Sequence, residues 1–160
     1  MTTSIERVEA VIRSFDLEVN VEHMPANTRT ALEAAQAVGC EIGQIVKSLI
    51  FETKTGDLLL LLVSGKHTVD VKKFKSDWGI ALNRADPQKV RSRTGFAIGG
   101  VAPIGHITSI DTWMDVALFS YSKVWAAAGA PNAVFAVTPN VLMGNNPRKK
   151  IPAFIETKKR

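Results

Sequence analysis

The chain has 160 residues, 46% of them hydrophobic and 22% charged, which suits one domain with a sizeable apolar core and excludes a disordered or fibrous protein. Its apolar stretches are much shorter than the roughly 20 residues of a membrane span, and no secretory signal is visible at its start. The net charge is +5, with four basic and eight acidic side chains in residues 1–52 against sixteen and seven in residues 53–160. We therefore predict a single cytoplasmic domain over residues 1–160, without a membrane partner. Its basic part either attracts a polyanion such as nucleic acid or only keeps the protein soluble.

The first 40 residues predict a helix, a strand and a second helix. Apolar residues at helical spacing predict an amphipathic helix over residues 5–15. Alternation of apolar and polar residues predicts a half-buried strand over residues 17–22. Thr30 and Glu33 have the spacing of a capping box, which predicts a short alanine-rich helix that ends at Gly39.

The middle of the chain predicts a hairpin of buried strands followed by two short helices. Residues 45–51 and 58–63 are apolar and β-prone, and the residues between them are typical of a turn. Asp70 and Asp86 are each placed to cap a helix. We expect a further strand near residues 80–83.

The last third of the chain predicts more strands and a short helix. Strands are expected at residues 109–114, 123–127 and 133–137, and Thr138 precedes the expected helix. Strands and helices mixed in this way indicate an α+β domain with a mixed sheet. The tail from about residue 146 carries six basic residues in its last thirteen positions, and we expect it to be a frayed basic end.

Cysteine and histidine are too sparse for most metal sites. Cys40 is the single cysteine, so the chain has no intramolecular disulfide and no thiolate cluster. The three histidines, His23, His67 and His106, are far apart in the sequence and show no metal-ligand spacing. We therefore expect neither a metal nor a cofactor.

Residues 94–106 are the most unusual stretch of the sequence. Four glycines and one proline are interleaved there with apolar residues, which indicates a backbone that turns sharply inside the fold. The glycine spacing is that of neither a dinucleotide-binding nor a Walker loop. Such a segment is either a structural turn or a loop whose main-chain groups hold an oxyanion or a sugar hydroxyl.

Lys47 is a charged residue in an otherwise apolar run, residues 44–51. Its ammonium group either reaches water from a strand or faces a pocket, where an anion such as a phosphate would offset the cost of burial. His106 allows general acid–base chemistry, as in a small-molecule hydrolase, or is a hydrogen-bonded structural residue. No Gly-x-Ser-x-Gly elbow surrounds Ser48 or Ser64, and Thr30 is already explained as a helix cap, so the pattern does not favour a serine hydrolase.

Several segments, taken in chain order, resemble the YbaK family, whose members are free-standing relatives of the editing domain of bacterial prolyl-tRNA synthetase. The resemblance covers roughly residues 5–143. The segments that carry it are Thr30-Ala31, residues 44–49 (QIVKSL), Thr94-Gly95-Phe96, residues 99–103 (GGVAP) and residues 124–129 (VWAAAG).

The resemblance implies an α+β fold whose mixed, mostly antiparallel sheet curls into a partial barrel with flanking helices. It also implies hydrolysis of the ester bond of a mischarged aminoacyl-tRNA, without a metal or a protein nucleophile. The partners would be a tRNA 3′ end that carries an amino acid and, in some cases, an aminoacyl-tRNA synthetase. An alternative with the same fold is a non-catalytic adaptor that binds tRNA or the ribosome.

The resemblance also assigns site residues. Lys47 would orient the tRNA 3′ end, and the loop would position the terminal adenosine and the ester through its main chain. The residues of that loop are Gly99, Gly100, Val101, Ala102 and Pro103. We further expect Thr30, Ser64 and His106 to contact the substrate.

One departure leaves the amino acid open. Members that act on cysteinyl-tRNA(Pro) carry an aspartate where this chain has the apolar residues Ala133, Val134 and Phe135. The identity of the amino acid is therefore not predicted. The sequence also does not predict the tRNA or the oligomeric state.

Overall fold

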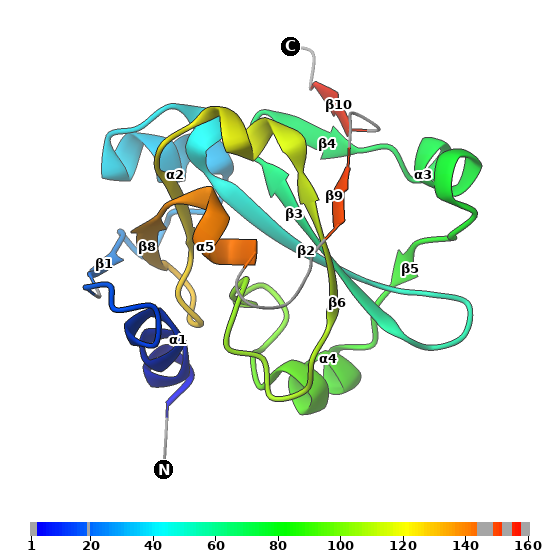
Figure 1. The fold of residues 1–160 in the computed structure, drawn as a ribbon, viewed down its shortest axis with the longest axis horizontal. Coiled ribbons are helices and arrows are strands. Elements are labelled where there is room, and N and C mark those ends of the chain that lie inside the picture. The colour runs from blue at the N-terminus through cyan, green and yellow to red at the C-terminus, as the bar shows by residue number, and fades with distance from the viewer. Residues whose placement is uncertain (1–2, 19, 144–148, 152–154, 158–160) are drawn as a thin grey trace.

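The most apolar stretch of the chain forms the central strand of a five-stranded sheet in the computed structural model (Figure 1), which describes residues 3–18, 20–143, 149–151 and 155–157. The strand order is β5-β2-β3-β6-β9. The bounds are β2 (Val46–Glu52), β3 (Leu58–Ser64), β5 (Asn83–Arg84), β6 (Asp111–Asp115) and β9 (Lys149–Ile151). β3 pairs antiparallel with β2 and parallel with β6, so the predicted hairpin and the predicted mixed sheet are confirmed. Burial of both faces explains why β3 is a continuous apolar run.

A three-stranded sheet lies against the start of β2. Its order is β1 (Val21–His23), β8 (Ala133–Val137) and β7 (Val124–Ala127), all antiparallel. A parallel bridge between Ile45 and Trp125 connects the two sheets. In the described part of the chain the sheets do not close into a barrel. A short pair, β4 (His67–Val69) with β10 (Ile155–Thr157), lies beyond the end of β3.

Local capping residues determine where the helices begin. Thr3 and Thr30 each form a complete capping box, and Asp70 and Asp86 each accept a hydrogen bond from an N–H in the first turn. The caps predicted at Thr30, Asp70 and Asp86 are confirmed. The helices are α1 (Ser4–Arg13), α2 (Ala31–Val38), α3 (Val71–Trp78), α4 (Pro87–Thr94) and α5 (Pro139–Met143), and η1 (Ile42–Gln44) and η2 (Val116–Ser120) are 3-10 turns. No helix among the residues the structure describes has the length and apolarity to cross a bilayer.

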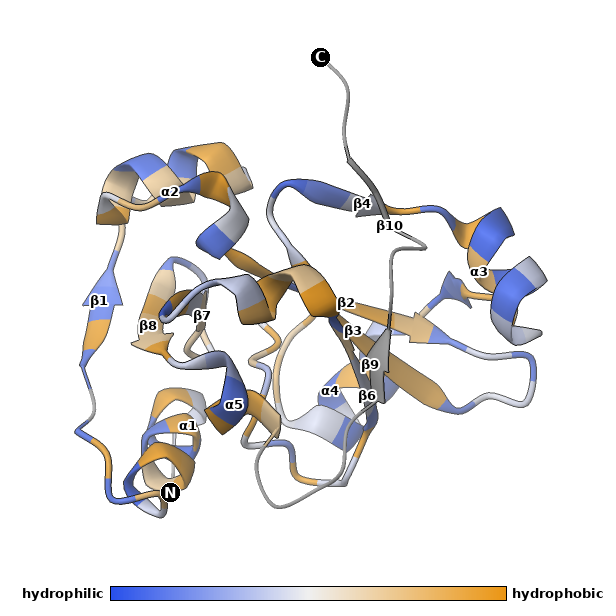
Figure 2. Ribbon diagram, turned by 45° about the horizontal axis from the view of Figure 1, so that its top comes forward, coloured by the Kyte–Doolittle hydropathy of each residue, from blue (hydrophilic) through white to orange (hydrophobic). Residues whose placement is uncertain are grey.

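The two faces of β2 and β3 serve different cores. Leu58, Leu60 and Leu62 belong to the main core, whereas Leu59 and Leu61 pack with Phe74 and Trp113 under α3. In Figure 2, β2 and β3 are coloured mostly as hydrophobic, in contrast to the mostly hydrophilic α3. A third cluster joins α2 to the bridge between the sheets.

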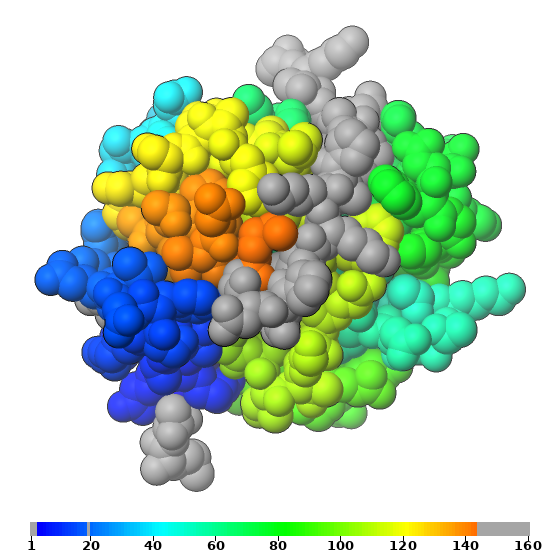
Figure 3. All heavy atoms as spheres, viewed as in Figure 1, coloured from blue at the N-terminus to red at the C-terminus, as the bar shows by residue number. Residues whose placement is uncertain are grey.

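Segments from the two ends of the chain meet over one side of the main core. In the space-filling view of Figure 3, residues of α1 (blue) adjoin those of β8 and α5 (orange), which adjoin those of η2 (yellow). Val8 and Ile12 of α1, Leu118 of η2 and Leu142 of α5 are all buried in this core. Residues far apart in sequence thus form one packed unit.

Two expectations need correction. The strand predicted at residues 17–22 begins only at Val21, because pairing with Phe135 of β8 sets its register, and Leu17 is 42% exposed. The tail is not simply frayed, because Lys149–Ile151 pairs with β6 and Ile155–Thr157 pairs with β4. The rest of the predicted basic tail lies outside the described residues.

Candidate functional site

A pocket of about 270 Å³ lies where α2, the start of β2, the glycine-rich loop and the strands β7 and β8 meet. Four of the predicted site residues line it, namely Thr30, Lys47, Gly99 and Val101. The other lining residues are Met24, Thr28, Arg29, Ala31, Ala34, Ile45, Val46, Ser48, Trp125, Ala127, Ala130, Asn132, Ala133 and Val134. Two lining residues are cationic and none is acidic. We call this hollow the loop pocket.

The start of α2 forms one wall of the loop pocket. The Thr30 hydroxyl accepts the N–H of Glu33 at 3.1 Å. The carboxylate of Glu33 accepts the N–H groups of Arg29 and Thr30 at 2.9 and 3.0 Å, and these bonds lower the pKa of that carboxyl. The capping box therefore holds Arg29 and Thr30 at the edge of the pocket.

Lys47 enters the site from β2. Strand alternation places it on the same face as Leu49 and Phe51, whereas Val46 and Ile50 turn into the main core. Its ammonium group donates a hydrogen bond to the carbonyl oxygen of His67. The half-buried cation is thus held by a neutral main-chain oxygen.

The glycine-rich loop, residues 95–106, is braced by two side chains. Arg7 donates to the carbonyl of Gly95 at 2.6 Å and lies over the Phe96 ring. His106 Nε2 donates to the carbonyl of Ala102 at 2.7 Å. Arg7 of α1 and His106 at the end of the loop therefore hold the loop in place.

Gly99 forms the tip of the loop at the pocket. Its φ of +90° is a conformation that side chains disfavour, although a Cβ there would meet no atom within 4 Å. Gly100 donates to the carbonyl of Ala97 at 2.9 Å and closes the turn. The N–H groups of Gly99 and Val101 have no hydrogen-bond acceptor among the described residues. The loop can therefore offer main-chain donors to a bound group.

The structure does not bring the other predicted residues to the pocket wall. Ser64 is fully buried, and its hydroxyl donates to the carbonyl of Gly43 at 2.8 Å. Gly100, Ala102 and Pro103 are buried and do not line the pocket, and the ring of His106 is used to brace the loop. Direct substrate contacts by Ser64 and His106 have no support from this geometry.

Arg29, Trp125 and Asn132 are three of the lining residues that the sequence did not single out as site residues. Arg29 directly precedes the capping residue Thr30, and that neighbourhood was its only signal. Trp125 lies in one of the segments that carry the family resemblance. Asn132 has a φ of +63° and accepts the N–H of Met24 through its carbonyl at 2.7 Å, which no sequence pattern indicated.

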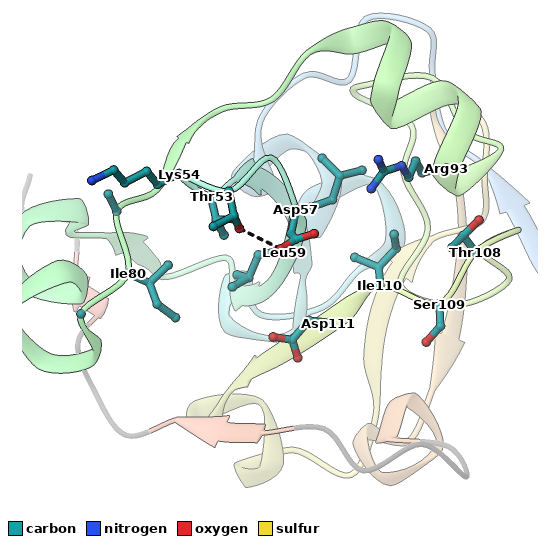
Figure 4. A pocket seen from close by; sticks show the side chains of 14 residues that line it. Thr53, Lys54, Asp57, Leu59, Ile80, Arg93, Thr108, Ser109, Ile110 and Asp111 are labelled. Carbon is teal, nitrogen blue, oxygen red and sulfur yellow. Dashed lines mark hydrogen bonds between the residues drawn. The ribbon is translucent and has the colours of Figure 1, made fainter.

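A larger hollow lies at the far end of the β2–β3 hairpin (Figure 4), and we call it the hairpin pocket. Its volume is about 540 Å³, and its charged lining residues are Lys54, Asp57, Arg93 and Asp111. Asp57 accepts a hydrogen bond from Thr55 at 2.8 Å, and Asp111 accepts one from the Trp113 indole at 3.2 Å. Its charges balance, and none of the predicted site residues lines it. Among the described residues, no three potential metal ligands gather in either hollow.

Comparisons with known proteins found a family model, relatives and solved structures that match this chain. Residues 25–144 match the aminoacyl-tRNA editing domain family. Protein YwhH of Bacillus subtilis (strain 168) is 28% identical over 139 residues, covering 87% of this chain and 88% of YwhH. Proline–tRNA ligase of Thermosipho melanesiensis is 38% identical over 89 residues, which are 55% of this chain and 15% of the ligase.

The fold has a matching solved structure. A chain described as "Crystal structure of a putative trans-editing enzyme for prolyl tRNA synthetase" is 42% identical, with a TM-score of 0.83, over 100% of this chain and 99% of that one. The family match spans α2, β2, the glycine-rich loop, β7 and β8, all of which line the loop pocket. This chain belongs to the aminoacyl-tRNA editing domain family.

Proposed function

We propose that the protein hydrolyses the ester bond between a wrong amino acid and the 3′-terminal adenosine of a tRNA, acting as a separate protein. Membership of the editing domain family and likeness to a chain described as a trans-editing enzyme support this activity. The observation that carries it is that Lys47 and the tip of the glycine-rich loop line the same pocket. A cation and main-chain donors can thereby reach one substrate from two sides.

The charges of the loop pocket suit the end of a tRNA. Arg29 and Lys47 line the pocket without an acidic neighbour in its lining, so a phosphate near the 3′ end would gain charge-assisted hydrogen bonds there. Contacts to phosphates release counterions, so we expect the affinity to fall as salt is raised. The net positive charge of residues 53–160 would assist the encounter.

The glycine-rich loop suits the chemistry at the ester. Water adds to the ester carbonyl carbon and loses a proton, and the carbonyl oxygen becomes an oxyanion. The oxyanion then re-forms the carbonyl as the bond to the ribose oxygen breaks, and the ribose oxygen takes up the proton that the water lost. The N–H groups of Gly99 and Val101 are the donors we assign to the oxyanion, and such a donor contributes about 3 kcal/mol to the transition state. A ribose hydroxyl of the substrate would help to orient the attacking water.

The remaining wall suits an uncharged amino-acid side chain. Ala127, Ala133, Val134 and Trp125 make this part of the pocket apolar. A charged side chain placed there would lose its hydration without gaining a partner. Ala133 and Val134, which stand where members acting on cysteinyl-tRNA(Pro) carry an aspartate, would thus restrict the substrate.

A panel of mischarged tRNAs tests this activity. Purified protein is incubated with each aminoacyl-tRNA, tRNA(Pro) first, and release of the amino acid is measured. We expect release from at least one member of the panel and much slower release by Lys47→Ala. If no amino acid is released and wild type equals Lys47→Ala, the activity is refuted, and tight salt-dependent tRNA binding without release would then support the adaptor alternative.

A further inference from the structure

A second polar cluster lies behind Lys47, on the side of β4 and β6. Asp115, at the end of β6, is only 2% exposed, and its Oδ2 lies 2.7 Å from Nδ1 of His67, whose side chain is 12% exposed. A carboxylate accepts hydrogen bonds, so Nδ1 of His67 carries the ring proton and donates this hydrogen bond to Asp115. None of these groups takes part in the chemistry described above.

Asp115 ties several elements to one point. Its Oδ2 also accepts the N–H of Ser64 at 3.1 Å, and its Oδ1 accepts the N–H of Ala117 at 2.9 Å. The end of β3, the start of β4 and the start of η2 are therefore held by one carboxylate. Ser64 in turn donates to the carbonyl of Gly43, just before β2 begins.

The same histidine reaches Lys47 through its main chain. The carbonyl oxygen of His67 accepts the hydrogen bond from the Lys47 ammonium group. Contacts thus run from Asp115 to the His67 ring, and from the His67 carbonyl to Lys47 at the loop pocket. A lysine side chain has four rotatable bonds, so a fixed acceptor strongly restricts where its charge lies.

We propose that His67 and Asp115 are a positioning pair that holds the Lys47 ammonium group at the loop pocket. This role rests on the proposed function, since it assigns the pair to the same site. Burying two ionisable groups yields little net stability compared with apolar packing, so geometry is the more fitting role for the pair. Neither residue touches the substrate; both act through the position of Lys47.

The first test is a kinetic cycle. His67→Leu keeps the bulk of the side chain but removes the donor, whereas His67→Asn keeps an N–H near the position of Nδ1. Deacylation rates are measured for both, alone and combined with Lys47→Ala. We expect His67→Leu to lower the rate about tenfold to hundredfold, as misplacement of an active-site group by about 1 Å does. His67→Asn should restore most of the rate, and His67→Leu should cause no further loss in the Lys47→Ala background.

A structural role would give a different pattern. Lys89→Met removes a partly buried ion pair, in which the Lys89 ammonium group lies 2.7 Å from the Glu52 carboxylate, and serves as the control for lost stability alone. We expect it to lower the thermal unfolding temperature without changing the rate. If His67→Leu lowers the rate by the same factor with and without Lys47, or leaves it unchanged, the positioning role is wrong.

The second test does not depend on activity. Lysines are acylated with an amine-reactive ester, and modification of Lys47 is compared with that of Lys54 by mass spectrometry. We expect His67→Leu, or Asp115→Asn if the former does not fold, to raise the modification of Lys47 several-fold, and His67→Asn to leave it near wild type. If no tRNA is deacylated, the proposed function fails while this measurement still decides the positioning role; unchanged modification refutes it.

Discussion

The loop pocket and the hairpin pocket differ in size, charge and the state of their polar groups. The hairpin pocket is about twice as large, at 540 Å³ against 270 Å³, yet it combines two cations with two carboxylates, both of which accept side-chain hydrogen bonds. The loop pocket has two cations and no acid in its lining, and its loop carries main-chain N–H groups without an acceptor among the described residues. Positively charged lining and main-chain donors without an acceptor among the described residues, rather than volume, therefore distinguish the candidate site.

The largest expected difference is between substitutions of Lys47 in the loop pocket and of Lys54 in the hairpin pocket. Lys47→Ala removes a charge-assisted contact worth about 1.5–3 kcal/mol, so deacylation should slow about tenfold to hundredfold. Lys54→Ala, in the hairpin pocket, should keep the wild-type rate. Single-turnover assays on one mischarged tRNA measure both. Equal losses of rate in the two variants would contradict the choice of the loop pocket as the site.

The two pockets also offer a matched pair of glycines. Gly99 and Gly79 have φ values of +90° and +73°, and a Cβ added at either position would have no atom within 4 Å. Alanine at either position should lower the stability by about 1 kcal/mol through backbone strain alone. Only Gly99→Ala should also slow deacylation, by about tenfold, because it shifts donors that contribute about 3 kcal/mol. Thermal unfolding and rate assays separate the effects; a fully active Gly99→Ala would contradict the role of the loop.

The arginines should differ in their effect on tRNA binding. Arg29→Ala removes a cation from the loop pocket, so tRNA affinity should fall and the slope of log K against log salt should decrease by about 1. Arg93→Ala, in the hairpin pocket, should change the slope less. Filter binding across a salt series gives both slopes. A larger change for Arg93 would place the tRNA at the hairpin pocket instead.

The smallest difference is expected in pH-dependent stability. The pKa of Glu33 is lowered by the N–H groups of Arg29 and Thr30, and that of Glu52 by its hydrogen bond with Lys89, both from an ordinary value of 4.5. Because the folded-state pKa is the lower one, each contribution to stability is present above the unfolded value and is lost as the pH falls through the folded value.

Glu33→Gln and Glu52→Gln should therefore lower the unfolding temperature near neutral pH and have a diminishing effect on acidification. Thermal unfolding from neutral pH to about pH 3 measures the loss. We expect the two variants to behave alike, because these contacts serve stability in both regions. If the substitutions lowered the unfolding temperature more as the pH fell, the lowered pKa values assigned to Glu33 and Glu52 would be wrong.

Local features were predictable from the sequence because their causes are local. Thr30 and Glu33 are three residues apart, and the cap they form needs no distant partner. The hairpin of β2 and β3 likewise follows from two apolar runs separated by a short turn. The lysine and the glycine-rich loop stood out as a cation and a flexible backbone in apolar surroundings. The family resemblance, and not a physical derivation, assigned them to one substrate.

Tertiary structure decided which of these residues meet. Ser64 and Thr30 both present a hydroxyl in the sequence, but packing buries Ser64 against Gly43 and leaves Thr30 at the pocket. The bond between His67 and Asp115 spans 48 positions of the chain, so no local spacing indicates it. Such contacts depend on how strands and loops pack over long sequence distances, whereas caps and hairpins depend on neighbours along the chain.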